Sequence, residues 1–101
     1  MKCYAIVQLN IHDESWIAGY GAPVTALVAK HGGRYLARTT DIRRLEGDGE
    51  PPNFVAVLEF PSHEAAMAFY DDPEYQPHLE ARLGGAEGHF LFVSGEDFVS
   101  R

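Results

Sequence analysis

The sequence predicts an α+β, ferredoxin-like domain, in which strands and helices follow the order β-α-β-β-α-β and the four strands form one antiparallel sheet. Four short runs have the alternating apolar pattern of strands, two longer runs have helical spacing, and glycine or proline marks their boundaries. The clearest strand covers residues 54–60. One of its faces is purely apolar (Phe54, Ala56, Leu58 and Phe60), whereas the other carries the carboxylate of Glu59.

The first strand and the first helix are expected at the start of the chain. Residues 3–11 alternate as a strand, and Gln8 and Asn10 share the far end of its more polar face. Asp13 is a suitable N-cap for the following helix, whose apolar spacing continues to His31. Gly32-Gly33 then ends this helix, because glycine adopts the left-handed cap conformation at little cost.

Residues 34–40 are expected to form the second strand. In a regular strand one face holds Tyr35, Ala37 and Thr39, and the other holds Arg34, Leu36, Arg38 and Thr40. Residues 41–53 contain two glycines and two prolines and are expected to form an exposed hairpin loop. This register places Arg38 on the same face as Glu59.

The second helical region has two parts. Pro61 ends the third strand, and Ser62 is expected to cap the helix that follows. A new helix is expected after the break at residues 72–74, with Leu79 and Leu83 facing inward.

The remaining chain completes one domain. Residues 89–94 alternate as the fourth strand, so the domain is expected to span residues 1–95, with a C-terminal tail at 96–101. The open face of the sheet, opposite the helices, carries Ile6, Leu36, Val55 and Val57 among polar residues, which is more apolar than a solvated surface usually is. Two such sheets packed face to face in a homodimer would cover these side chains.

Composition and charge restrict the possible partners. The net charge is −7, and an acidic surface disfavours both nucleic acid and anionic membranes. Cys3 is the only cysteine, so no internal disulfide forms, and a small packed residue is the favoured interpretation over a nucleophile. No signal peptide or membrane-length apolar run is present, so a cytoplasmic location is expected.

Several segments together are similar to a known family. They are GGRYLAR at 32–38, LEG at 45–47, LEFPS at 58–62, AA at 65–66, FY at 69–70, and the stretch from PEY at 73–75 to Arg82. In order and spacing, over nearly the whole chain, they resemble the bacterial family known as domain of unknown function 1330. The resemblance implies a dimeric α/β-barrel protein, from a superfamily that also includes cofactor-independent monooxygenases, isomerases and haem enzymes. A shared fold does not transfer any of these chemistries. Gly19, Gly21 and Pro77 depart from the family pattern, which has helix formers there.

The candidate site centres on Arg38 and Glu59. A guanidinium and a carboxylate that face each other across two strands can form a bidentate pair. One interpretation is catalytic: Arg38 holds an acid or enolate, Glu59 acts as a base or orients the ligand, and His89 assists from the start of the fourth strand. Gln8 and Asn10 would then supply hydrogen bonds, and Tyr35 would line a ligand pocket. The alternative is an ion pair that only fixes the register and the assembly of the dimer.

The histidines give no metal signature. His12, His31, His63, His78 and His89 lack the spacings of metal-binding motifs, and no cysteine accompanies them, so neither a metal nor another cofactor is expected. Two functions from different classes stay open: a cofactor-independent enzyme or binder of a small apolar or aromatic molecule with an acidic group, and a non-catalytic homodimeric module.

Overall fold

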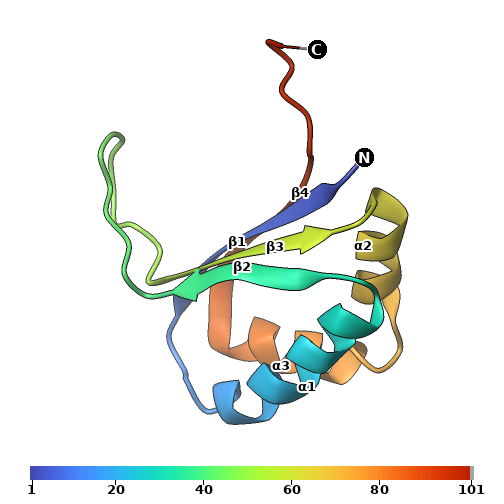
Figure 1. The fold of residues 1–101 in the computed structure, drawn as a ribbon. Coiled ribbons are helices and arrows are strands. Elements are labelled where there is room, and N and C mark those ends of the chain that lie inside the picture. The colour runs from blue at the N-terminus through green and yellow to red at the C-terminus, as the bar shows by residue number, and fades with distance from the viewer. Residues whose placement is uncertain (101) are drawn as a thin grey trace.

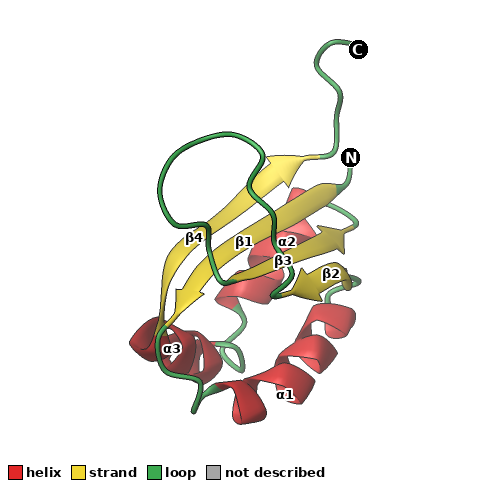
Figure 2. Ribbon diagram, turned by 90° about the vertical axis from the view of Figure 1, so that its left-hand side faces the viewer, coloured by secondary structure: helices red, strands yellow, loops and turns green. Residues whose placement is uncertain are grey.

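The computed structural model describes residues 1–100 and contains the predicted sheet (Figure 1). The elements are β1 (Cys3–Ile11), α1 (Ile17–Lys30), β2 (Arg34–Thr39), β3 (Phe54–Phe60), α2 (His63–Asp71), α3 (Gln76–Gly85) and β4 (Ala86–Ser94). The strands lie in the order β2-β3-β1-β4, and all neighbours are antiparallel. The three helices lie on one face of the sheet (Figures 1 and 2), so the predicted fold class is confirmed.

The N-terminus lies beside the end of β4, where the Gly95 N–H donates to the Lys2 carbonyl, and the residues after β4 extend away from the sheet (Figure 1). Of the predicted tail, residues 96–100 are described and Arg101 lies outside the described residues, so the domain boundary stays a prediction. No helix within residues 1–100 combines the length and apolarity needed to cross a membrane. The cellular location also stays a prediction.

The core lies between the sheet and the helices. Its fully buried members include Cys3, Val24, Phe60, Phe69 and Tyr75. Burial raises the pKa of the Cys3 thiol, which keeps this group in its unreactive neutral form. The packing role expected for Cys3 therefore agrees with its position.

Helix α1 begins later than the sequence predicts. The Asp13 carboxylate accepts a hydrogen bond from the Ser15 backbone N–H at 2.9 Å, so it closes a turn before the helix and does not cap it. The other end is as expected: Gly32 has φ = 79°, and the N–H groups of Gly32 and Gly33 donate to the carbonyls of Ala29 and Val28. These two bonds make a Schellman cap.

The second strand is not regular. Arg34 pairs with Glu59 and Tyr35 with Leu58, but the register then shifts, and Arg38 pairs with Ala56. One additional residue within a strand reverses the face of every side chain after it. Arg38 therefore lies on the helix side of the sheet, and its predicted placement beside Glu59 is wrong.

Helix α3 also presents a different face from the one predicted. Leu83 is 61% exposed, whereas Arg82 is only 5% exposed, so Arg82 takes the inward position. Pro77 is tolerated because it lies in the first turn, where a missing N–H leaves no helical hydrogen bond unmade. The helix continues through Gly84-Gly85 directly into β4, which begins three residues earlier than expected.

The predicted cap of α2 is confirmed: the Ser62 hydroxyl accepts a hydrogen bond from the Ala65 N–H at 3.0 Å. Ser62→Ala is expected to lower the free energy of unfolding by about 1 kcal/mol, because this N–H loses its acceptor. Chemical denaturation measures the change, and Ser62→Asp is the matched control, since aspartate also caps. Equal midpoints for the alanine variant and the wild type would contradict this role.

A buried carboxylate ties α1 to the junction between α2 and α3. The Asp72 side chain is 5% exposed, and its Oδ2 lies 2.8 Å from His31 Nε2 and 2.9 Å from Lys30 Nζ. Asp72 Oδ1 accepts from the Glu74 N–H at 2.9 Å. The hydrogen bonds from His31, Lys30 and the Glu74 backbone hold the pKa of Asp72 well below its ordinary value of 3.8.

This shift predicts a pH-dependent contribution to stability. Because the folded-state pKa is depressed, the contribution is complete above the unfolded-state pKa of 3.8 and is lost as the pH falls below it. Asp72→Asn should therefore destabilise the protein clearly at pH 7, and the difference from the wild type should shrink below about pH 4. Thermal melting across pH tests this, with the exposed neighbour Asp71→Asn as control. A difference that does not change with pH would refute the assignment.

Candidate functional site

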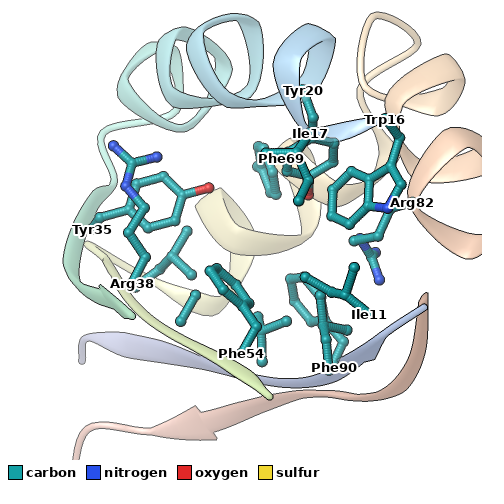
Figure 3. A pocket seen from close by; sticks show the side chains of 14 residues that line it. Ile11, Trp16, Ile17, Tyr20, Tyr35, Arg38, Phe54, Phe69, Arg82 and Phe90 are labelled. Atoms are coloured by element: carbon teal, nitrogen blue, oxygen red, sulfur yellow. The ribbon is translucent and has the colours of Figure 1, made fainter. Parts of the chain in front are cut away.

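A cavity of about 140 Å³ lies between the helix side of the sheet and the helices (Figure 3). The strands contribute mostly aliphatic and aromatic side chains, because every second residue of β1 and β3 faces the helices. Its lining consists of Val7, Leu9, Ile11, Trp16, Ile17, Tyr20, Tyr35, Arg38, Phe54, Ala56, Leu58, Phe69, Arg82 and Phe90. The two arginines are the only charged members of this set.

The opening of the cavity lies between α1 and β2. Ile17 and Arg38 are the two lining residues whose side chains are exposed. The Arg38 guanidinium stacks on the Tyr35 ring, 3.9 Å from its centroid, and donates a hydrogen bond to the Thr25 hydroxyl at 2.8 Å. Arg38 thus borders the opening with its charge already engaged by α1 and by an aromatic face.

Arg82 lies at the other side of the cavity, toward α3 (Figure 3). Its Nη2 donates to the Tyr75 hydroxyl at 3.3 Å, and the Tyr75 and Tyr20 hydroxyls are 3.0 Å apart. Burial by itself lowers the pKa of Arg82, but the Tyr75 and Tyr20 hydroxyls more than offset this, and the guanidinium stays charged. No carboxylate within residues 1–100 forms an ion pair with it.

Two residues of the lining each have a buried donor without an acceptor within the described part of the chain: Arg82 Nε and Trp16 Nε1. The tyrosines also retain their protons, because burial raises the pKa of Tyr20 far above its usual range and raises that of Tyr35. The lining contains no carboxylate, imidazole, amine or thiol. The cavity can therefore donate hydrogen bonds and stabilise negative charge, but it offers no conventional general base.

The structure separates the predicted site residues into two groups. Tyr35 and Arg38 line the cavity, whereas Gln8, Asn10, Glu59 and His89 lie on the open face of the sheet. Side chains alternate along each strand, so the cavity residues Val7, Leu9, Leu58 and Phe90 place their neighbours Gln8, Asn10, Glu59 and His89 on the opposite face. The six residues therefore do not form one site within the chain.

Glu59 has other partners than Arg38. Its carboxylate oxygens lie 2.9 Å from Arg34 Nε and 3.1 Å from Lys2 Nζ, and the Tyr4 hydroxyl donates to it at 3.4 Å. The hydrogen bonds from Arg34 and then Lys2 lower the pKa of Glu59, so it is ionised at neutral pH. The predicted Arg38–Glu59 pair is wrong. The irregularity in β2 places Arg38 on the helix side of the sheet, and Arg34 is the arginine of β2 that contacts Glu59.

Metal binding has no structural support among the described residues. No group of three or more histidine, cysteine, aspartate or glutamate side chains within residues 1–100 lies close enough to hold an ion. The histidines form separate interactions, such as that of His31 with Asp72 and that of His63 with the Ser94 hydroxyl at 2.9 Å.

A family model matches nearly the whole chain. The sequence profile described as "Domain of unknown function (DUF1330)" matches residues 2–96. Among curated proteins, none matches this sequence significantly.

Several solved structures share the fold. A protein of unknown function from Rhodopseudomonas palustris, RPA0582, has a TM-score of 0.79 and 16% identity, with 95% of this chain and 83% of that chain covered. SnoaB, a cofactor-independent oxygenase from Streptomyces nogalater, has a TM-score of 0.68 and 14% identity over 95% and 94% of the two chains. A dimeric ferredoxin-like protein from Bacteroides fragilis has a TM-score of 0.60 and 15% identity over 92% and 95%. Identities this low support the fold alone.

Because Glu59 pairs with Arg34 and not with Arg38, the structure predicts which substitutions couple energetically. Arg34→Met and Glu59→Gln should have effects on the free energy of unfolding that are not additive, because the two side chains are in contact. Arg38→Met and Glu59→Gln should be additive within experimental error, since these side chains lie on opposite faces of the sheet. Two double-mutant cycles measured by urea denaturation distinguish these cases. Coupling confined to the Arg38 cycle would show that the register of β2 is wrong.

Proposed function

This chain belongs to the DUF1330 family, and from the cavity that its side chains enclose we propose that it binds a small apolar or aromatic molecule bearing an acidic group. The observation that carries the proposal is a buried, unneutralised guanidinium in the wall of an otherwise apolar cavity. Ligand sites typically combine an apolar lining with a few placed polar groups. A buried charge without a protein counterion is stabilised when a ligand supplies the opposite charge.

The same cavity is compatible with an enzyme that uses no cofactor. Such an enzyme would act by stabilising negative charge on a ligand oxygen, because the lining supplies donors and a cation but no base. SnoaB is described as a cofactor-independent oxygenase, and its similarity to this chain is one of fold. Binding is therefore the part of the function that the residues support directly, and any chemical step requires a ligand that is already anionic.

We also propose that the open face of the sheet forms a homodimer interface. Leu36, Leu91 and Val93 are 45%, 51% and 41% exposed, and the central residues Ile6 and Val57 lie between them. An exposed apolar patch of this kind is typical of an interaction surface. The similar Bacteroides fragilis protein is described as dimeric, which supports the same assembly here.

The dimer has a direct test. The protein is expected to have twice the 11.2 kDa mass of one chain at micromolar concentration. Leu91→Asp should shift this mass toward the monomer, because two carboxylates would be buried in a symmetric interface. Leu83→Asp, at a leucine on α3 that is 61% exposed against 51% for Leu91, is the matched control and should leave the mass unchanged. Light scattering that reports a monomer for the wild type would refute the proposed interface.

The ligand site can be tested by filling the cavity. Saturating benzoate or toluene should stabilise the wild type, by about 2.7 kcal/mol at a hundredfold excess over Kd. Ala56→Leu, in the cavity lining, should remove most of this stabilisation because the larger side chain occupies the ligand's space. Ala29→Leu, exposed on α1, should behave like the wild type. Equal stabilisation of both variants in thermal melts would place the binding site elsewhere.

A further inference from the structure

We infer that Arg82 and Trp16 Nε1 form an anion subsite in the cavity and that this subsite selects a carboxylate carried on a single ring. The inference rests on the proposed ligand-binding function and adds two properties to it: the residues that hold the acidic group and the size of the ligand. Neither residue is among the site residues predicted from the sequence.

The charge of Arg82 is the first support. The residue is 5% exposed and its Nε has no acceptor, while the partners of its guanidinium are the hydroxyls of Tyr75, at 3.3 Å from Nη2, and of Tyr20. Its guanidinium carbon lies 5.5 Å from the centroid of the Phe90 ring, and it occupies the last turn of α3, where the helix dipole favours a cation. These contacts reduce the free-energy cost of burying the charge, but the Nε–H still has no hydrogen-bond acceptor. A buried donor without an acceptor is uncommon in native proteins.

Trp16, the residue just before α1, supplies the second donor. Its indole edge packs against Gly85, so closely that a Cβ at this glycine would lie 2.5 Å from Nε1. Gly85 follows Arg82 by three residues and therefore lies on the same face of α3. Figure 3 shows Trp16 and Arg82 together at this side of the cavity. Two neighbouring residues of the lining thus each carry a donor that lacks an acceptor, and a ligand carboxylate has two oxygens, one for each donor.

Arg38 does not offer an equivalent subsite. It lies at the opposite side of the cavity from Arg82 (Figure 3), is exposed, and already donates to Thr25. An anion bound there would be screened by water, whereas an anion at Arg82 would interact in an environment of low dielectric constant. The acidic group is therefore assigned to Arg82, with the ring of the ligand toward the aromatic side chains Phe54, Phe69 and Phe90.

The volume of the cavity limits the ring system. An apolar cavity of about 150 Å³ accommodates one benzene molecule, and the cavity here measures about 140 Å³. One six-membered ring fits the interior, whereas a second fused ring would extend into the opening beside Arg38 or require the walls to move. The predicted class of ligand is therefore a benzoate-like acid.

The test compares an acid with its neutral analogue. Calorimetry at pH 7 measures Kd for benzoate, for benzamide, which has a similar shape but no charge, and for 1-naphthoate. Wild-type protein should bind benzoate at least about tenfold more tightly than benzamide, since hydrogen bonds to charged groups are the stronger ones. Benzoate should also bind about tenfold or more tightly than 1-naphthoate, because the second ring exceeds the cavity.

Three variants locate the subsite. Arg82→Met should abolish the preference for benzoate over benzamide while benzamide binding persists, and Arg38→Met should keep the preference. Trp16→Phe removes the indole N–H together with the fused five-membered ring. The added space affects benzoate and benzamide alike, whereas loss of the N–H should weaken benzoate binding severalfold more than benzamide binding. This variant keeps the inference testable even if Arg82→Met fails to fold.

The failures of the two proposals are distinguishable. Binding of benzamide and benzoate with equal affinity would overturn the anion subsite but leave the ligand-binding cavity intact. If Arg38→Met loses the preference for benzoate over benzamide while Arg82→Met or Trp16→Phe retains it, the assignment of the acidic group to Arg82 and Trp16 is also overturned. No binding of any of the three compounds would overturn both proposals.

Discussion

The three described helices all pack on one face of a four-stranded sheet, and this one-sided arrangement determines the other features of the molecule. The helices cover the apolar side chains that β1 and β3 direct toward them. They do not fill all of the space there, which leaves a cavity near the N-terminal end of α1. The opposite face has no helix over it within residues 1–100, and it carries exposed leucine and valine together with the Glu59 ion pairs. One face is therefore suited to a small ligand and the other to a second protein surface.

Sequence patterns were sufficient for most of the fold because they reflect strong local preferences. The limits of β1 and β3, the glycine cap of α1 and the Ser62 cap of α2 follow directly from alternation and from capping chemistry. The predicted start of α1 was wrong, because the Asp13 carboxylate accepts from the Ser15 N–H in a local turn and does not cap the helix. Such competition between a turn and a cap is decided by the tertiary position of the helix.

The candidate site was harder to predict, for two physical reasons. The irregularity after Tyr35 has no signal in composition, yet it moved Arg38 from the open face to the cavity. Arg82 was missed because charged side chains are rarely buried, and Leu83 was the more natural inward residue. A signal was present in retrospect: Tyr75, Arg82 and Gly85 recur at intervals of seven and three residues, which places a hydroxyl, a cation and a gap for an indole on one helical face.

The chemistry of the cavity follows from an excess of donors. Tyrosine hydroxyls with raised pKa values, an indole N–H and a guanidinium can all interact with an anion, and none of them removes a proton readily at neutral pH. A buried guanidinium without a counterion, such as that of Arg82, is costly to the fold, and a bound anion would offset this cost.

The most direct test of the central claim uses Trp16, which is the only tryptophan in the chain. Its indole N–H gives a single resonance in a proton–nitrogen NMR spectrum, free of overlap from other tryptophans. Addition of benzoate should shift this resonance downfield, because the N–H gains a charged acceptor, whereas benzamide should shift it much less. A resonance that benzoate leaves unchanged at concentrations that saturate binding would contradict the placement of the acidic group beside Trp16 and Arg82.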